Sequence, residues 1–171
     1  MRLGGKARMA RWRWTLSAVL LLGGVQAAAQ GDTPKADHLW QAARADYVLQ
    51  CAGCHRVDGR GSNPHGIPDF RQSVGAFVHL PAGRQYLIRV PGAAHSQLSN
   101  AELADVLNWL LNEFSASQLP ADFIPYDEAE VARARPQRYD DVVPVRHQLA
   151  EELTSMGYSL SAYSYGSDRK P

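Results

Sequence analysis

The chain has 171 residues, a length that fits one domain, with 18 Lys or Arg and 17 Asp or Glu. Five of the basic residues and none of the acidic ones precede position 30, so the rest of the chain carries 13 basic and 17 acidic residues, a formal charge of −4. Nucleic-acid binding requires a basic patch, and this acidic balance excludes that class of partner.

The first 29 residues have the pattern of a secretory signal peptide. A basic lead precedes an uncharged apolar run from Trp14 to Val25, and Ala27, Ala28 and Ala29 supply the small residues that a signal peptidase needs. The run is about a dozen residues long, short of the roughly 20 needed to cross a bilayer, and an uncleaved N-terminal anchor is the alternative. We therefore predict an exported, periplasmic protein with no transmembrane span after cleavage.

A helix is predicted from about Pro34 to Gln50, because proline suits the first helical position. Leu39, Ala43 and Tyr47 recur at spacings of four and predict one apolar face. The segment that follows, residues 58–66, is rich in Gly, Asn, Ser and Pro and is typical of a loop.

The strongest helical signal lies later in the chain. Residues 77–90 fit either a short helix or an extended segment, and Pro91–Gly92 is expected to interrupt the chain. Ser99 and Glu102 then form a capping box. Apolar residues follow at helical spacing and predict a helix packed on a core: Leu103, Val106, Leu107, Leu110, Leu111 and Phe114.

Beyond residue 120 the sequence patterns that predict helices become weaker. Asp127 and Glu130 predict a second capping box for a short helix that Pro136 ends. A weaker helix is expected over 145–156, and residues 159–171, rich in Ser, Tyr and Gly, are expected to be poorly ordered. The chain as a whole is predicted to be all-α with long loops.

The two cysteines of the chain lie in the motif Cys51–Ala52–Gly53–Cys54–His55. Two thiols separated by two residues and followed at once by a histidine fit the attachment of a c-type haem. One turn of chain places both sulfurs along one porphyrin edge and the histidine beneath the iron. The sequence therefore predicts one covalently bound haem c, held by Cys51 and Cys54, with His55 as the metal ligand.

Three other uses of a CxxC pair fit the sequence less well. A thioredoxin-type dithiol lies beside a βαβ pattern, which this chain lacks. A structural zinc site needs about four ligands, and the other histidines are scattered singly. A disulfide, which exported proteins form, leaves His55 and the glycine-rich loop unexplained.

The segment from Tyr47 to Gly61, continued by Gly66–Ile67–Pro68, resembles the small class I cytochromes c. In that family a helix leads into CxxCH, and a glycine-rich loop and a proline follow. The resemblance covers about residues 41–114 and implies a cytochrome c-like helical domain, which we expect over 30–119. Residues 120–171 would then form an extension with short helices and a poorly ordered end.

The resemblance also implies roles for further residues. The backbone carbonyl of Pro68 would accept a hydrogen bond from the ring of His55, which fixes the ring and raises its basicity. Tyr47 and Trp109 would meet where the two helices cross.

The sequence departs from the family at the second iron ligand. The family normally supplies a methionine in the loop before the last helix, but the methionines here are Met1, Met9 and Met156. His95 is the preferred substitute, because it directly precedes the capped helix. Other candidates are His79, Met156 and, with weaker cases, His38, His65 and His147. An open, five-coordinate iron is the remaining alternative.

These features favour an electron-transfer protein over an enzyme. A single-electron carrier would connect a periplasmic dehydrogenase or a quinol-oxidising complex with a downstream acceptor such as a terminal oxidase. The alternative is a haem enzyme or gas-binding sensor with an open distal site, which the missing methionine suggests. A third hypothesis is a subunit that works only within a complex and docks through residues 120–171.

Overall fold

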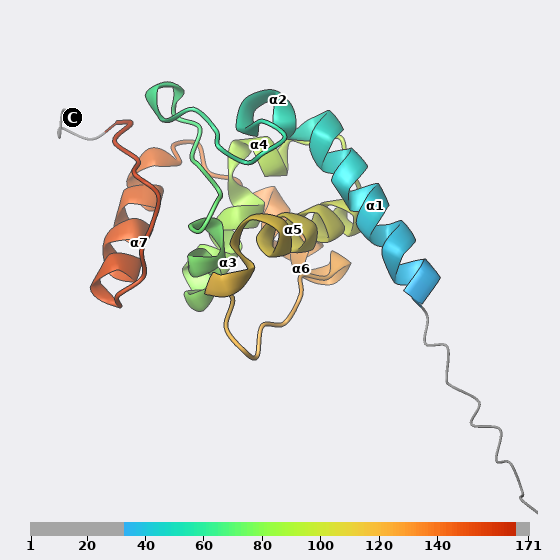
Figure 1. Cartoon of the computed structure of the whole chain (residues 1–171). Helices are drawn as coiled ribbons and strands as arrows, with labels where there is room; N and C mark the ends of the chain where they lie inside the picture. The colour runs from blue at the N-terminus through green and yellow to red at the C-terminus, as the bar shows by residue number, and fades with distance from the viewer. Residues whose placement is uncertain (1–32, 167–171) are drawn as a thin grey trace, which may run out of the picture. The chain divides into compact units, whose positions relative to one another are not determined.

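The computed structural model describes residues 33–166, and the regular elements in that range are helical, which confirms the all-α class (Figure 1). The predicted signal peptide, residues 1–29, lies outside the described residues. Four 3₁₀ segments connect the helices: Asn63–His65, Val74–His79, Ala116–Gln118 and Arg135–Gln137. The α-helices are α1 (Thr33–Gln50), α2 (Ala52–His55), α3 (Pro81–Arg89), α4 (Pro91–Ala94), α5 (Asn100–Ser115), α6 (Glu128–Ala134) and α7 (Val143–Ser155).

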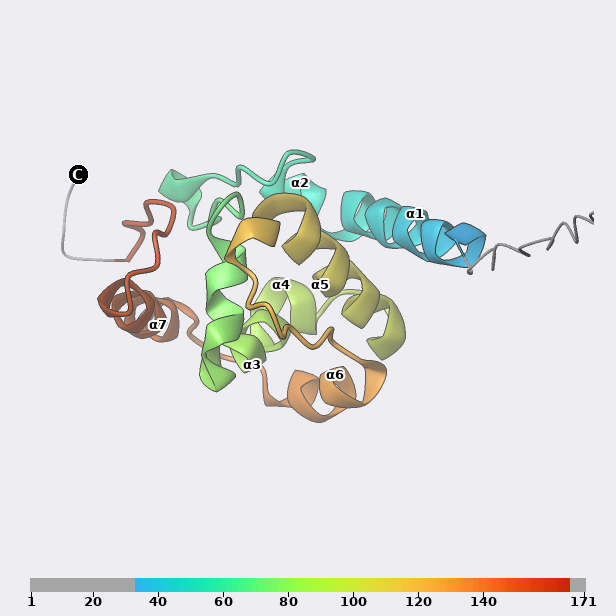
Figure 2. The same cartoon turned by 60° about the horizontal axis from the view of Figure 1, so that its bottom comes forward.

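Helix α5 occupies the centre of the described chain and packs against both α1 and α6 (Figure 2). The predicted capping box is confirmed: the Ser99 hydroxyl accepts from the Glu102 backbone N–H at 3.2 Å, and the Glu102 carboxylate accepts from the Ser99 N–H at 2.7 Å. All six residues of the predicted apolar stripe are buried. This helix therefore supplies the largest share of the core.

Helix α1 is confirmed, but only two of the three residues of its predicted apolar face are buried. Ala43 and Tyr47 lie in the core, whereas 52% of Leu39 is exposed. In both views the N-terminal half of α1 extends beyond α5 (Figures 1 and 2).

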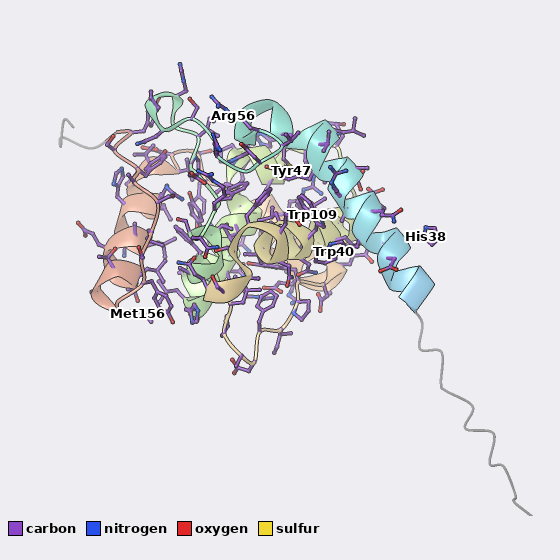
Figure 3. The ribbon with its side chains drawn as sticks, in the orientation of Figure 1. His38, Trp40, Tyr47, Arg56, Trp109 and Met156 are labelled. Atoms are coloured by element: carbon purple, nitrogen blue, oxygen red, sulfur yellow. The ribbon has the colours of Figure 1, made fainter. Side chains whose placement is uncertain are left out.

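The crossing of α1 and α5 is made by aromatic side chains (Figure 3). The rings of Tyr47 and Trp109 lie 5.0 Å apart between centroids, as the sequence resemblance implied. The Tyr47 hydroxyl also donates a 2.7 Å hydrogen bond to the carbonyl of Arg56, directly after α2. One side chain thus joins the two long helices to the end of the cysteine motif.

The ambiguous residues 77–90 are helical. Val74–His79 forms a 3₁₀ segment and α3 follows from Pro81. The expected interruption before Pro91–Gly92 is confirmed, because α3 ends at Arg89. Pro91 then occupies the first turn of α4, where its missing N–H costs no hydrogen bond.

Helix α6 begins as predicted at Asp127, whose carboxylate accepts from the Glu130 N–H at 2.7 Å. The second half of the predicted capping box is wrong. The Glu130 carboxylate instead accepts two hydrogen bonds from the Arg84 guanidinium, at 2.6 and 2.7 Å. This partly buried bidentate pair joins α6 to α3 and stabilises their packing more than a return bond within the helix end would.

The C-terminal residues 159–166, expected to be poorly ordered, make specific contacts with the loop after α2. The Ser161 hydroxyl donates to the Asp69 carbonyl at 2.8 Å, and its N–H donates to the Ser73 hydroxyl at 3.0 Å. The Tyr163 hydroxyl donates to the Gly66 carbonyl at 3.2 Å. Residues 167–171 lie outside the described range.

The predicted helix over 145–156 is found as α7, and it contributes Leu149 and Leu153 to the hydrophobic core. Within residues 33–166, no helix combines the length and apolarity needed to cross a membrane.

Replacing Leu153 tests whether α7 belongs to the same cooperative unit as the rest of the core. Its side chain is 0% exposed, so Leu153→Ala is expected to lower the free energy of unfolding by about 2–5 kcal/mol. Met156→Ala, at a side chain that is 51% exposed, is the matched control and should change it by less than about 0.5 kcal/mol. Equal denaturation curves for the two variants would show that α7 unfolds separately.

Replacing Tyr47 by Phe keeps the aromatic packing and removes one hydrogen bond. The Arg56 carbonyl then keeps only the longer bond from the Gly59 N–H at 3.2 Å, so the free energy of unfolding should fall by about 1 kcal/mol. Tyr139→Phe is the control, since the Tyr139 hydroxyl makes no hydrogen bond to a described residue. Chemical denaturation of both variants checks this, and an unchanged Tyr47→Phe protein would contradict it.

Candidate functional site

The cysteine motif forms one helical turn at the end of α1. The Cys51 N–H donates to the Tyr47 carbonyl at 2.9 Å, and the His55 N–H donates to the Cys51 carbonyl at 2.9 Å, so the helical bonding continues from α1 into α2. Arg56 then adopts a positive φ of 64° and ends the turn. Cys51, Cys54 and His55 all line the same cavity.

His55 is held from the loop that follows. Its Nδ1 lies 3.3 Å from the Pro68 carbonyl oxygen, which is the partner that the sequence implied. The ring stacks on Phe70 with centroids 4.0 Å apart. Burial lowers the pKa of His55 to about 4; the Pro68 bond opposes this shift and the nearby charge of Arg146 adds to it. The imidazole is therefore neutral near pH 7, the form in which histidine binds a metal.

The glycine-rich loop is required by a close approach of two backbone segments. Gly61 has a φ of +60° and its N–H donates to the His55 carbonyl at 3.0 Å. A Cβ at this position would lie 2.4 Å from the Pro68 carbonyl oxygen, the same atom that contacts the His55 ring. The absence of a side chain at Gly61 thus allows the proline to reach the histidine.

Cys51 and Cys54 are free thiols. Burial, and to a smaller extent the charges of Asp46 and Cys54, raise the pKa of Cys51 to about 11. A redox dithiol of the thioredoxin type needs a lowered thiol pKa, so the environment of Cys51 speaks against that alternative. In the described part of the chain, no three His, Cys, Asp or Glu side chains gather to hold a metal ion, which leaves a zinc site without a ligand set.

The cavity that these residues line has a volume of about 300 Å³. Such a size is typical of a small-molecule or cofactor site. Its wall is mostly apolar and comes from α3, α5 and the segment around α4. The apolar lining residues include Val74, Leu87, Val90, Leu103, Val106, Leu107 and Leu110. Two thiols and one neutral imidazole at a mostly apolar wall fit a flat, hydrophobic group that bonds to sulfur and carries a metal.

None of the proposed second iron ligands lines this cavity. His95 is exposed and lines a separate hollow beside Arg135. Both ring nitrogens of His79 are hydrogen-bonded, Nε2 to the Gln118 carbonyl and Nδ1 to the Tyr158 hydroxyl, each at 2.7 Å. Met156 lies half-exposed near the outer end of α7 (Figure 3).

The weaker histidine candidates are also directed elsewhere. His38 is exposed on α1, His65 contacts the Ser62 hydroxyl at 2.7 Å, and His147 contacts the Tyr165 carbonyl at 3.0 Å. His55 is therefore the one imidazole among the described residues that line the cavity.

Sequence reasoning missed Arg146, a buried cation that lines the cavity from α7. Its position contains a signal: Arg146, Leu149 and Leu153 follow one another at helical spacings of three and four, and all three are buried. A charged residue within an apolar helical face indicates that its charge lies inside the protein and has a role there.

Two curated relatives share much of this chain. It is 30% identical over 142 residues to a cytochrome c-552 of Thermus thermophilus, a match that covers 72% of this chain and 87% of the relative. It is 28% identical over 116 residues to another cytochrome c-552 of that species, with 57% of this chain and 88% of the relative covered. No model of a known protein family matches the chain.

The first of these matches extends over most of the relative's length, and the helical fold described above agrees with it. The CxxCH turn, the neutral histidine held by Pro68 and the mostly apolar cavity agree with this match. The chain therefore belongs to the c-type cytochromes.

Proposed function

We propose that this protein is a monohaem, single-electron carrier of the periplasm. Cys51 and Cys54 would form thioether bonds to one haem c, and His55 would bind the iron through Nε2. Haem iron supplies a reversible one-electron change between the ferrous and ferric states. The observation that carries the proposal is the arrangement of both thiols and one neutral imidazole at the wall of a single apolar cavity.

The chain's own residues have three tasks in this function. The Pro68 carbonyl fixes the orientation of His55 through its bond to Nδ1, which leaves Nε2 for the metal. The apolar side chains of α3 and α5 exclude water from the cavity, which is a main influence on reduction potential. Each transfer oxidises a donor by one electron and reduces an acceptor by one electron, and no bond to the polypeptide changes.

The partners would be other redox proteins. The acceptor side would be a terminal oxidase or another cytochrome, and the donor a periplasmic dehydrogenase or a quinol-oxidising complex. Exposed apolar side chains flank the cysteine motif, with Leu49 77% and Val57 67% exposed. The formal charge of −4 after residue 29 would steer a basic partner face toward the protein at low salt.

Replacing both cysteines tests the attachment. The Cys51→Ala/Cys54→Ala protein, produced in cells that mature c-type cytochromes, should release all its haem into acid acetone, because no thioether bond can form. The wild-type chain should keep one haem and show the corresponding added mass. His38→Ala, at an exposed histidine of α1, is the control and should also keep its haem. Pigment that stays attached to the double variant would refute the assignment.

A second candidate function is the binding of a small ligand at the iron. The observation that favours it is the cavity wall, where the described residues supply no methionine and no histidine other than His55. A haem enzyme or gas sensor needs such an open position.

Carbon monoxide distinguishes the two functions. If the iron has an open position, carbon monoxide should change the visible spectrum of the ferrous protein, and should do so equally in a His95→Ala variant, because His95 lies outside the cavity. A sharp low-spin spectrum that carbon monoxide leaves unchanged would eliminate the open-site function. A low-spin wild type that becomes high-spin in His95→Ala would show that His95 is a ligand after all.

A further inference from the structure

Arg146 is a cation inside the cavity, and no acidic side chain within residues 33–166 pairs with it. Its side chain extends from α7, is 6% exposed, and lines the same cavity as Cys51, Cys54 and His55. Its Nε has no hydrogen-bond partner among residues 33–166. A guanidinium is always charged, and burying a charge is costly unless it is paired and hydrogen-bonded. The side chain is therefore placed to bind an anion that enters the cavity.

The protein holds this guanidinium in place but offers it no acid. Its central carbon lies 4.3 Å from the ring centroid of Tyr163 and 5.2 Å from that of Phe77, so both rings position it by cation–π contact. Asp69 is the single acidic residue among those described at the cavity wall, and its carboxylate already pairs with Arg71 at 2.6 and 3.0 Å.

The cation and the thiols enter the cavity from different directions. In both views α7 lies on the far side of α3 from α1 and α2, which carry the cysteine motif (Figures 1 and 2). Haem c has its two propionate groups on the porphyrin edge remote from the positions that form thioether bonds. A haem attached through Cys51 and Cys54 would therefore direct its carboxylates away from α2.

We propose that Arg146 binds a propionate carboxylate of the haem, so that the C-terminal segment completes the cofactor pocket. This rests on the proposed attachment of haem to the cysteine motif. A guanidinium and a carboxylate form strong, charge-assisted hydrogen bonds, which satisfy the Nε that the polypeptide leaves unpaired. The positive charge also stabilises the reduced iron relative to the oxidised iron, so Arg146 is a positioning residue that raises the reduction potential.

The test uses the full mature holoprotein and measures reduction potential and resonance Raman spectra. Arg146→Gln should lower the potential and shift the propionate bending band. Arg146→Lys retains the charge and should lie closer to the wild type in potential. Arg133→Gln, at an exposed arginine of α6, is the matched control and should change neither quantity. An Arg146→Gln protein with the potential and Raman band of the control would overturn the proposal.

Two further measurements keep the test decisive if Arg146→Gln does not fold. A crystal structure of the wild-type holoprotein should show a guanidinium nitrogen within hydrogen-bond distance of a propionate oxygen, and a distant propionate would overturn the proposal. Inorganic phosphate, added at constant ionic strength, should leave the wild-type potential unchanged because the site is already occupied. A saturable phosphate effect that Arg146→Lys alters would instead assign the site to a free anion.

Failure of this inference differs from failure of the proposed function. If the mass of the wild-type chain shows no covalent haem, both the proposed function and the role of Arg146 are refuted. If the chain carries covalent haem but its reduction potential is unchanged in Arg146→Gln, only the role of Arg146 is refuted.

Discussion

The crossing of α1 and α5 is the contact from which the site geometry follows. Tyr47 packs on Trp109 at this crossing and bonds through its hydroxyl to the Arg56 carbonyl, so the turn that carries the cysteine motif has one orientation relative to the core. That orientation presents both thiols and His55 to the cavity. The loop after the motif then folds back toward His55, and the Pro68 carbonyl fixes the histidine ring. Packing, rather than local chain preference, thus places the reactive atoms.

The segment beyond residue 120 is part of the same structure and does not resemble an appended tail. Its two helices bury side chains in the core that α5 organises, and the Arg84–Glu130 pair joins α6 to α3. Arg146 and Tyr163 reach the cavity wall itself. This distribution of contacts favours a role inside the cofactor pocket over a role in docking alone, because the residues that dock to a partner would have to remain exposed.

Sequence reasoning succeeded where one local rule acts alone. The capping box at Ser99 and the apolar stripe that follows it each depend on spacing along the chain. It failed where a distant residue decides the outcome. Glu130 leaves its helix cap because Arg84 lies within reach, and the tail is ordered because Ser161 finds partners in a loop about 90 positions earlier. His95 has a suitable position in sequence, but it lines a separate hollow and not the cavity.

The hydrogen bonds of residues 161–163 to the loop at 66–73 have a consequence for folding. They join segments about 90 positions apart, so the loop can reach this arrangement only after most of the chain has been made. A shortened chain that lacks residues 161–163 would lose these bonds, and the loop that carries Pro68 would be held less firmly against the His55 ring.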